Sequence, residues 1–282
     1  MKRDEVRKVA SEAFEKLVRD VEAGMSETLQ QYLKAMGRFH RYSVGNAILI
    51  QLQRGDATRV AGFRAWQKLG RHVKKGEHGI AIMAPVVYRR KVQQDGDRDV
   101  EAEMISTFKT AYVFDISQTD GKPLPEFARA QGDPGAYLPR LERFVSDRGI
   151  KLERGDLKIA EGVSIGGTIL LKASLARADA FSVLVHELAH ELLHQDPANR
   201  PKEKTVREAE AEAVAYVVCQ GIGLDVNTAS SDYIQLYHGD KRMLVASLER
   251  VQRTAAEILE AVTDDGPCVE AAGRPVGVTV AA

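Results

Sequence analysis

Apolar residues recur every three to four positions over the first fifty residues of the chain, and this spacing predicts three amphipathic helices. The first spans residues 4–23, and the second runs from Ser26, a favourable N-cap residue, to about residue 40. The third begins after Ser43 and is stopped by Gly55. The chain is therefore expected to open with a small helical unit.

The pattern changes after residue 60, where short apolar runs alternate with glycines and charged residues. We interpret residues 60–70 as a short helix and residues 71–79 as a basic turn between two glycines. Residues 80–88 predict a strand, the acidic segment 93–103 a hairpin loop, and residues 108–115 the antiparallel partner strand. Helices followed by a hairpin indicate a small α+β domain.

Prolines and glycines gather in residues 119–135, a composition typical of a linker. We therefore expect one domain over residues 1–118 and another over residues 136–263. The last residues, 264–282, are rich in Gly, Ala and Pro and are expected to be disordered. The elements predicted for the second domain are a helix over 136–147, strands over 150–152, 157–159 and 168–172, helices over 180–194 and 202–220, and one or two closing helices over 233–262.

The composition is that of an ordinary soluble protein of 282 residues, with 44% hydrophobic and 28% charged residues. No run of 18 apolar residues is present to span a membrane, and the charged N-terminus lacks the pattern of a signal peptide. Two cysteines, Cys219 and Cys268, form neither a disulfide framework nor a CxxC motif. We therefore expect a cytoplasmic location and no membrane partner.

The formal net charge is zero, but basic residues are concentrated in the first half of the chain. Residues 34–91 contain 13 Lys and Arg against only Asp56 and Glu77, a net charge of +11 that suits a polyanionic partner. Aromatic residues are interleaved with these charges, and rings that stack on unpaired bases favour single-stranded DNA. The candidate DNA-binding residues are Tyr42, Asn46, Arg59, Phe63, Trp66, Arg71, Lys74 and Lys75.

A structural explanation of the same residues is also open. Phe63 and Trp66 could be core residues of a small domain whose lysines form a solvated face, and for Phe63 alone the core is favoured. Asn46 could cap a helix or bind a phosphate. The near absence of acidic residues over the whole window favours nucleic acid.

The segment His186-Glu187-Leu188-Ala189-His190 lies within an uninterrupted apolar-periodic run and has the HExxH pattern. Residues four apart lie on one helix face, so His186 and His190 can both bind one metal ion. Glu187 is turned away from that axis and can take a proton from a metal-bound water. This is the arrangement of a zinc peptidase; the alternative is two surface histidines on an amphipathic helix.

A third ligand is expected from the helix over residues 202–220, where Glu208 and Glu212 lie one turn apart on the same face. We assign Glu208 as the carboxylate ligand and Glu212 as the acceptor that orients a ligand histidine, with the exchanged assignment left open. Glu208 would serve the backbone if Thr205 formed a capping box, but residues 199–201 make a better helix start.

Two further residues near this site are expected to stay outside the metal's coordination shell. His194 lies about 12 Å from His186 along the helix axis, too far to share an ion, and is interpreted as packing or as support for a ligand. Glu210 is expected to point well away from Glu208 and Glu212.

Several short segments of the first domain carry a family resemblance. They are Tyr42 to Asn46, Val60 to Phe63 with Trp66, Gly70-Arg71, Val73 to Glu77 with Gly79-Ile80, and Phe114 to Thr119. With these segments the region resembles the single-stranded-DNA-binding N-terminal domain of the ArdC antirestriction family. The last segment is similar to the usual end of that domain.

The second half has its own resemblance, carried by His186 to His190 with His194 and by residues 208–215. These segments resemble the zincin-like metallopeptidase domains found with that module and in the ImmA/IrrE regulators. The resemblance implies an α+β protein in which a small basic α+β nucleic-acid-binding domain precedes a mainly helical zincin-like domain with a small antiparallel sheet. Related peptidases often have Asp or Asn where Glu212 stands.

The sequence thus predicts a single-stranded-DNA-binding zinc metallopeptidase in which His186, His190 and Glu208 hold Zn²⁺ and Glu187 is the catalytic base. The resemblance implies antirestriction, the protection of incoming plasmid or phage DNA, with a protein or peptide substrate that the sequence does not identify. Two alternatives stay open: a regulatory peptidase that cleaves a transcriptional repressor, and a DNA-binding protein with a non-catalytic metal site. Only three ligands are evident, which favours catalysis over a closed structural site.

Overall fold

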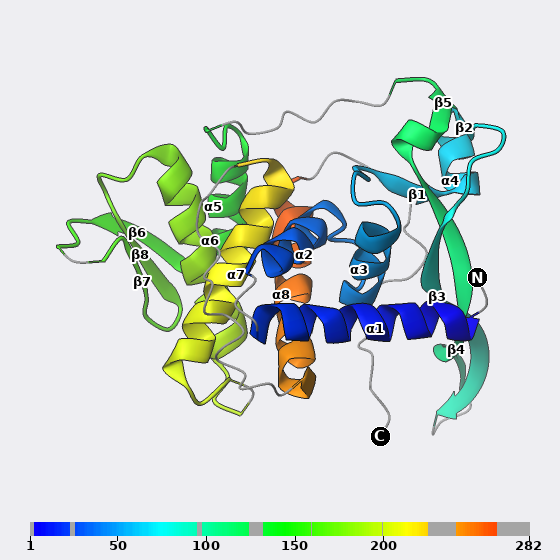
Figure 1. Ribbon diagram of the computed structural model, residues 1–282. Helices are drawn as coiled ribbons and strands as arrows, with labels where there is room; N and C mark the ends of the chain where they lie inside the picture. The colour runs from blue at the N-terminus through cyan, green and yellow to red at the C-terminus, as the bar shows by residue number, and fades with distance from the viewer. Residues whose placement is uncertain are drawn as a thin grey trace.

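Helices occupy the middle of the molecule in the computed structural model, with β-structure at both ends (Figure 1). The helices α2, α7 and α8 lie centrally, the sheet of β6, β7 and β8 lies at one end, and the long β3–β4 hairpin lies at the other. The structure describes residues 3–22, 26–94, 98–123, 132–158, 160–198, 200–224 and 241–263. The tail expected over 264–282 is outside the described residues.

The three predicted N-terminal helices are present as α1 (Arg3–Glu22), α2 (Ser26–Arg38) and α3 (Val44–Gln53). The side chain of Ser43 accepts a hydrogen bond from the backbone N–H of Asn46, as expected for the N-cap of α3. The local capping signal therefore placed the start of α3 correctly.

The first sheet contains three antiparallel strands in the order β1–β4–β3. They are β1 (Val60–Gly62), β3 (Ile80–Gln94) and β4 (Arg98–Asp115). The helix predicted over residues 60–70 is only partly correct, because its first residues pair with the end of β4 and only α4 (Phe63–Lys68) is helical. The described part of the acidic segment expected to be a loop is strand, and its pairing with β3 extends as far as Gln94 opposite Arg98.

Strand β3 is an edge strand, and two side-chain amides of α3 cover part of its exposed backbone. Asn46 donates to the carbonyl of Met83 and accepts from the same residue's N–H, at 2.8 and 2.9 Å. Gln53, two helical turns later, makes the same pair of bonds with Ala81 at 2.8 and 2.9 Å. These bonds satisfy backbone groups that an open edge would leave to solvent or to another chain.

A small two-stranded sheet follows the hairpin, formed by β2 (Arg71–Val73) and β5 (Thr119–Gly121). The turn η1 (Ile116–Gln118) connects β4 to β5, and buried Asp115 caps it by accepting from the N–H and hydroxyl of Ser117. The other carboxylate oxygen accepts from the backbone N–H groups of Thr58 and Arg59. The N-terminal unit thus continues into the range expected to be linker.

Substitution Asp115→Asn is expected to lower the free energy of unfolding by about 2 kcal/mol at neutral pH, because one amide oxygen replaces two ionised acceptors. Burial acts to raise the pKa of Asp115, but the bonds from Ser117, Thr58 and Arg59 outweigh it and lower that pKa. This stabilisation is present above the unfolded-state pKa of about 3.9 and is lost as pH falls through the folded-state pKa. Urea unfolding at several pH values, with exposed Asp120→Asn as control, tests this; a difference from wild type that persists at the acid end would contradict it.

The second half begins with a helix and a three-stranded sheet in the order β6–β8–β7. Strand β6 runs parallel to β8, so the sheet is mixed and not purely antiparallel as expected, whereas β7 is the antiparallel edge strand. The elements of this half are α5 (Tyr137–Asp147), β6 (Lys151–Gly155), β7 (Gly162–Ser164), β8 (Thr168–Lys172), α6 (Arg177–His194), α7 (Lys204–Ile222) and α8 (Lys241–Val262).

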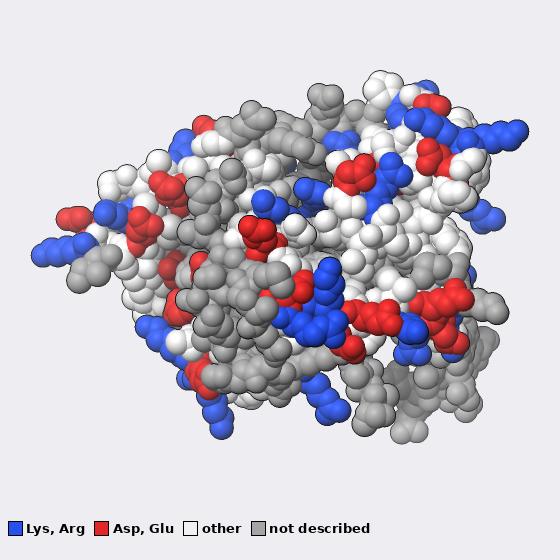
Figure 2. Space-filling model, in the orientation of Figure 1, with Lys and Arg blue, Asp and Glu red and all other residues white. Residues whose placement is uncertain are grey.

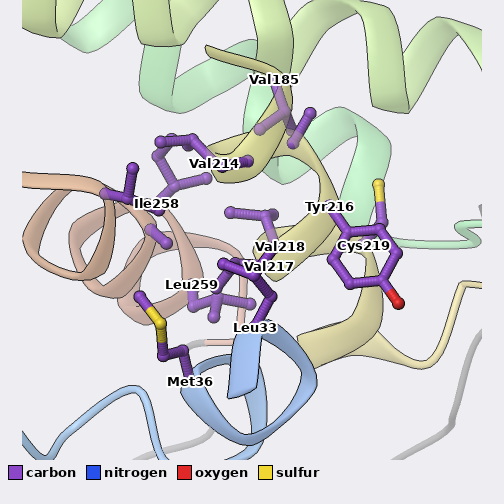
Figure 3. Close-up of a cluster of buried hydrophobic side chains, with 14 of the residues drawn as sticks. Leu33, Met36, Val185, Val214, Tyr216, Val217, Val218, Cys219, Ile258 and Leu259 are labelled. Carbon is purple, nitrogen blue, oxygen red and sulfur yellow. The ribbon is translucent and has the colours of Figure 1, made fainter. Parts of the chain in front are cut away.

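One cluster of buried hydrophobic side chains extends through both halves of the chain. Figure 3 shows Leu33 and Met36 of α2 against α7 and α8. Gly37 permits this packing, because a Cβ atom there would lie 2.6 Å from the carbonyl oxygen of Val217. The predicted α+β class is confirmed, and no helix among the described residues is long and apolar enough to cross a membrane.

Candidate metal centre and nucleic-acid surface

The metal-binding candidates lie on α6, which has no Gly or Pro and buries Phe181, Leu184 and Leu188 in the core. Its opposite side carries His186 and His190, whose ring centroids are 4.8 Å apart. The spacing of four residues thus produces the expected shared face. Helix α7 packs beside it and contributes Glu208.

His186, His190 and Glu208 bring three donor atoms together. The two Nε2 atoms are 3.1 Å apart, and Oε2 of Glu208 lies 3.6 and 3.4 Å from those of His186 and His190. Donors about 2 Å from a tetrahedral ion are separated by roughly 3.3 Å. The three residues therefore fit one divalent metal ion, and the Glu208 side chain, 47% exposed, lies at the open side of the site.

The surroundings of His186 and His190 lower the pKa of both side chains, which favours the unprotonated form that binds metal. Burial lowers the pKa of His186, and burial together with the adjacent His186 lowers that of His190 to about 4; Glu208 opposes both effects. A metal ligand must present an unprotonated nitrogen. At neutral pH the two imidazoles are therefore already unprotonated at one ring nitrogen and do not have to release a proton when they bind a metal ion.

Glu187 lies beside the three donors, 8% exposed, between α6 and the edge strand β7. A Cβ atom at Gly162 of β7 would come within 2.8 Å of the Glu187 side chain, so only glycine permits this approach. Burial, then the Glu208 carboxylate, raises the pKa of Glu187 to about 7, and a bond from the backbone N–H of Ser164 partly offsets this. A carboxyl with this pKa can accept and return a proton at neutral pH.

A second carboxylate of α7, Glu210, also contacts a histidine of α6 and lies 3.1 Å from Nε2 of His194. The sequence correctly predicted that Glu210 points away from Glu208. It did not predict that the buried side of α7, which carries Glu210, would contact His194. The orienting role expected of Glu212, which is half-buried, stays a prediction. A carboxylate within an otherwise apolar helix face was the available signal for Glu210.

Three candidate DNA-binding residues have internal roles instead. Trp66 is 2% exposed and donates its indole N–H to the carbonyl of Phe114 at 2.9 Å. Asn46 is bonded at both ends of its amide to Met83, and the hydroxyl of half-buried Tyr42 donates to the carbonyl of Val60. The expectation that these side chains are presented to DNA is therefore corrected by their burial and bonding.

The remaining candidates differ in how far they are exposed. Arg71 joins β2 to β5 by donating to the hydroxyl and carbonyl of Thr119, at 2.8 and 2.9 Å. Lys74 donates to the carbonyl of Ser117, although its side chain is 41% exposed. Arg59 is half-buried, whereas Lys75 and Phe63 are exposed.

An aromatic surface, formed by Phe63, Tyr112 and Phe114, lies on β4 and the start of α4. Phe63 is 48% and Tyr112 46% exposed, and the Phe63 and Phe114 rings meet edge to face at 6.4 Å. Exposed basic side chains accompany it, and Figure 2 shows Lys and Arg over the region of α4, β2 and β5. They are Arg64, Lys68, Lys75 and Lys122.

Substitution Asn46→Ala is expected to lower the free energy of unfolding by about 2 kcal/mol, because two hydrogen bonds to β3 are lost. Any affinity of the folded protein for single-stranded DNA is expected to stay within twofold of wild type, about 0.4 kcal/mol at most. Urea unfolding followed by Trp66 fluorescence and the anisotropy of a labelled oligonucleotide measure the two effects. Lost DNA affinity at unchanged stability would restore Asn46 as a phosphate-binding residue.

Comparison with known proteins matches the N-terminal part of the chain to a family and most of the chain to individual relatives. Residues 7–114 match the family model of the N-terminal domain of anti-restriction factor ArdC. Similar curated proteins include an uncharacterised protein, pXO2-81, of Bacillus anthracis, 24% identical over 92% of this chain and 52% of its own length. Another is the uncharacterised protein y4eC of Sinorhizobium fredii, 24% identical over 68% of each chain. The chain thus spans about half the length of the Bacillus relative.

Solved structures extend the similarity to the whole fold. The metal-free crystal structure of the antirestriction ArdC protein from the R388 plasmid matches 90% of this chain and 98% of its own, with a TM-score of 0.54 and 18% identity. The Mn(II)-bound structure of that protein matches 92% of this chain and 99% of its own, with a TM-score of 0.52 and 19% identity. At these identities the likeness establishes the fold.

Proposed function

Since this chain is an ArdC-like protein in its N-terminal domain and in its fold, we propose that it is an antirestriction protein that binds single-stranded DNA and hydrolyses peptide bonds at a zinc centre. The observation that supports this most is the convergence of His186, His190 and Glu208 beside the buried carboxyl of Glu187. A metal site with three protein donors and an open side is typical of catalysis.

The DNA-binding part of the proposal rests on the aromatic surface. Phe63 and Tyr112 present half-exposed rings, and every base offers a face for stacking whatever its identity. The surrounding lysines and arginines can neutralise phosphates, which favours binding that weakens with salt. Bases in a duplex are already stacked, so single strands should bind more tightly.

The peptidase part assigns one role to each residue of the metal centre. A zinc ion would supply a water of lowered pKa and would polarise the peptide carbonyl. His186, His190 and Glu208 would hold the ion, and Glu187 would accept the proton of the attacking water and return it to the leaving amine. The N–H of Ser164 holds the Glu187 carboxylate in place before the reaction.

Substitution Phe63→Ala is expected to weaken single-stranded DNA binding by about tenfold, because one stacking contact is worth roughly 1–3 kcal/mol. Exposed Leu52→Ala, on α3, is the matched control for loss of an apolar side chain. Anisotropy of a labelled oligonucleotide at two salt concentrations measures both variants. Equal affinities for wild type and Phe63→Ala would remove the aromatic surface from the proposal.

The antirestriction role can be tested in cells that carry a restriction system. Unmodified plasmid should transform these cells more efficiently when the wild-type protein is present, and equally well with or without it in cells lacking the system. Phe63→Ala tests the DNA surface and Glu187→Gln the metal centre in the same assay. No protection by the wild-type protein would contradict the proposed role.

A further inference from the structure

A continuous row of hydrogen bonds leads from the metal centre into the core. Nδ1 of His190, the ring nitrogen away from the ligand cluster, lies 3.0 Å from Nδ1 of His194. Nε2 of His194 lies 3.1 Å from Glu210, whose second oxygen accepts from Ser247 and Arg250 of α8. Three helices, α6, α7 and α8, thus meet at one carboxylate.

The residues of this row are buried, so their hydrogen bonds are formed inside the folded protein and not at its surface. His194 is 6% exposed and Glu210 is fully buried, and a buried carboxylate is costly unless it is hydrogen-bonded and paired. The carboxylate is paired with the guanidinium of Arg250 and accepts a hydrogen bond from the hydroxyl of Ser247, so its buried charge is compensated. Glu210 is therefore a fixed anion that requires a donor from His194.

Hydrogen-bond polarity then determines where each ring carries its proton. Because the Glu210 carboxylate only accepts, His194 must donate from Nε2, which leaves Nδ1 of a singly protonated ring as an acceptor. That acceptor faces Nδ1 of His190, which must donate. His190 is then unprotonated at Nε2, the atom 3.1 Å from His186 Nε2 and 3.4 Å from Glu208.

We propose that His194 and Glu210 are positioning residues for the metal centre, which set the orientation and the tautomer of His190 so that its Nε2 faces the ion. Arg250 and Ser247 hold Glu210 in this arrangement and make α8 part of the site. The inference rests on the metal centre of the proposed function, but the tautomer it assigns does not require metal to be present. A partner beyond a ligand histidine commonly changes metal affinity by 10–100-fold.

Helix α8 is itself anchored to the N-terminal half, which makes it a firm support. The side-chain amide of Gln252 donates to the carbonyls of Met36, His40 and Tyr42, at 3.4, 3.2 and 3.2 Å. Arg250 and Gln252 lie two residues apart on α8, so the helix that holds Glu210 is fixed to the end of α2. The helix that supports the metal centre is thus itself anchored to the N-terminal half of the chain.

The first test reads the tautomer directly in the full-length protein without metal. Long-range ¹H–¹⁵N spectra of histidine-labelled protein, assigned with a His190→Gln variant, should show His190 protonated at Nδ1 only and His194 at Nε2 only. In Glu210→Gln, the His194 pattern should become a mixture of tautomers. His190 protonated at Nε2 in the wild-type protein would overturn the inference, whether or not the protein binds zinc.

The second test measures zinc affinity by competition with a chromophoric chelator. Glu210→Gln and His194→Phe should each weaken zinc binding by about tenfold or more, whereas His194→Gln, which keeps a donor and an acceptor, should recover part of this loss. Glu203→Gln, which changes an exposed carboxylate at the N-cap of the same helix, is the matched control. Circular dichroism of the metal-free variants identifies any variant that fails to fold. If a variant does not fold, the tautomer spectra of the wild-type protein decide whether the inference holds.

Outcomes for the inference and for the proposed function are separable. Unchanged zinc affinity in both folded variants would overturn the positioning role even if the protein is an active peptidase. A wild-type protein that binds no zinc but has the assigned tautomers would contradict the proposed metal centre and leave the hydrogen-bond row established.

Discussion

Substitution Glu187→Gln is expected to reduce peptide hydrolysis by about 10³-fold while leaving zinc affinity within about threefold of wild type. The amide cannot accept a proton from water, and Glu187 is not one of the three clustered donors. Glutamine has nearly the size of the protonated acid, so the packing against Gly162 is retained. Cleavage is measured by mass spectrometry of new N-termini in a proteome-derived peptide library.

The matched control is Asp179→Asn, which removes an exposed carboxylate from the first turn of the same helix and should leave hydrolysis unchanged. Retained cleavage in Glu187→Gln would exclude Glu187 as the base. A zinc-loaded wild-type protein that produces no more new termini than the variant would favour a non-catalytic metal site. That result would leave the DNA-binding part of the proposal intact.

Helices with strong local signals were predictable from the sequence. The hydroxyl of Ser43 and the glycine at position 223, whose φ is +79°, mark helix ends through local chemistry alone. Strands β1, β2 and β5 are each three residues long, and their pairing partners lie far along the chain. Such strands depend on tertiary pairing and leave no periodic pattern, so residues 60–62 were predicted as helix.

Spacing along one helix predicted the metal cluster well, because His186 and His190 are neighbours by helix geometry. The supporting contacts were harder to predict, since they depend on which helix covers the far side of α7. No pattern in the sequence says that Arg250 faces Glu210 from a helix forty residues later. An acidic residue inside the apolar face of α7 was the only hint.

Composition predicted a basic N-terminal half but could not separate exposed aromatic rings from buried ones. Phe63 and Trp66 lie one turn apart on α4, yet one is 48% exposed and the other 2%. The difference arises because Trp66 faces β4 and donates a hydrogen bond to the carbonyl of Phe114, whereas the ring of Phe63 meets the Phe114 ring edge to face at the surface. Trp66 is therefore suited to report unfolding, and Phe63 is the better candidate for stacking.

Substitution Arg250→Met is expected to lower the free energy of unfolding by about 3 kcal/mol, because the fully buried carboxylate of Glu210 loses its cationic partner. Methionine keeps much of the arginine's apolar stem, so lost packing contributes little. Urea unfolding of the metal-free protein, followed by Trp66 fluorescence, measures the effect. The matched control is Arg253→Met, which changes an exposed arginine one helical turn after Arg250.

The cause can be separated from a general weakening of α8 by a double-mutant cycle. If the loss comes from an unpaired charge, adding Glu210→Gln to Arg250→Met should restore about 1–2 kcal/mol, because a neutral amide is less costly to bury. If Arg250 stabilises only by packing, the two losses should add. Strictly additive losses would therefore contradict the ion pair as the link between α8 and α7, and would leave His194 as the main partner of Glu210.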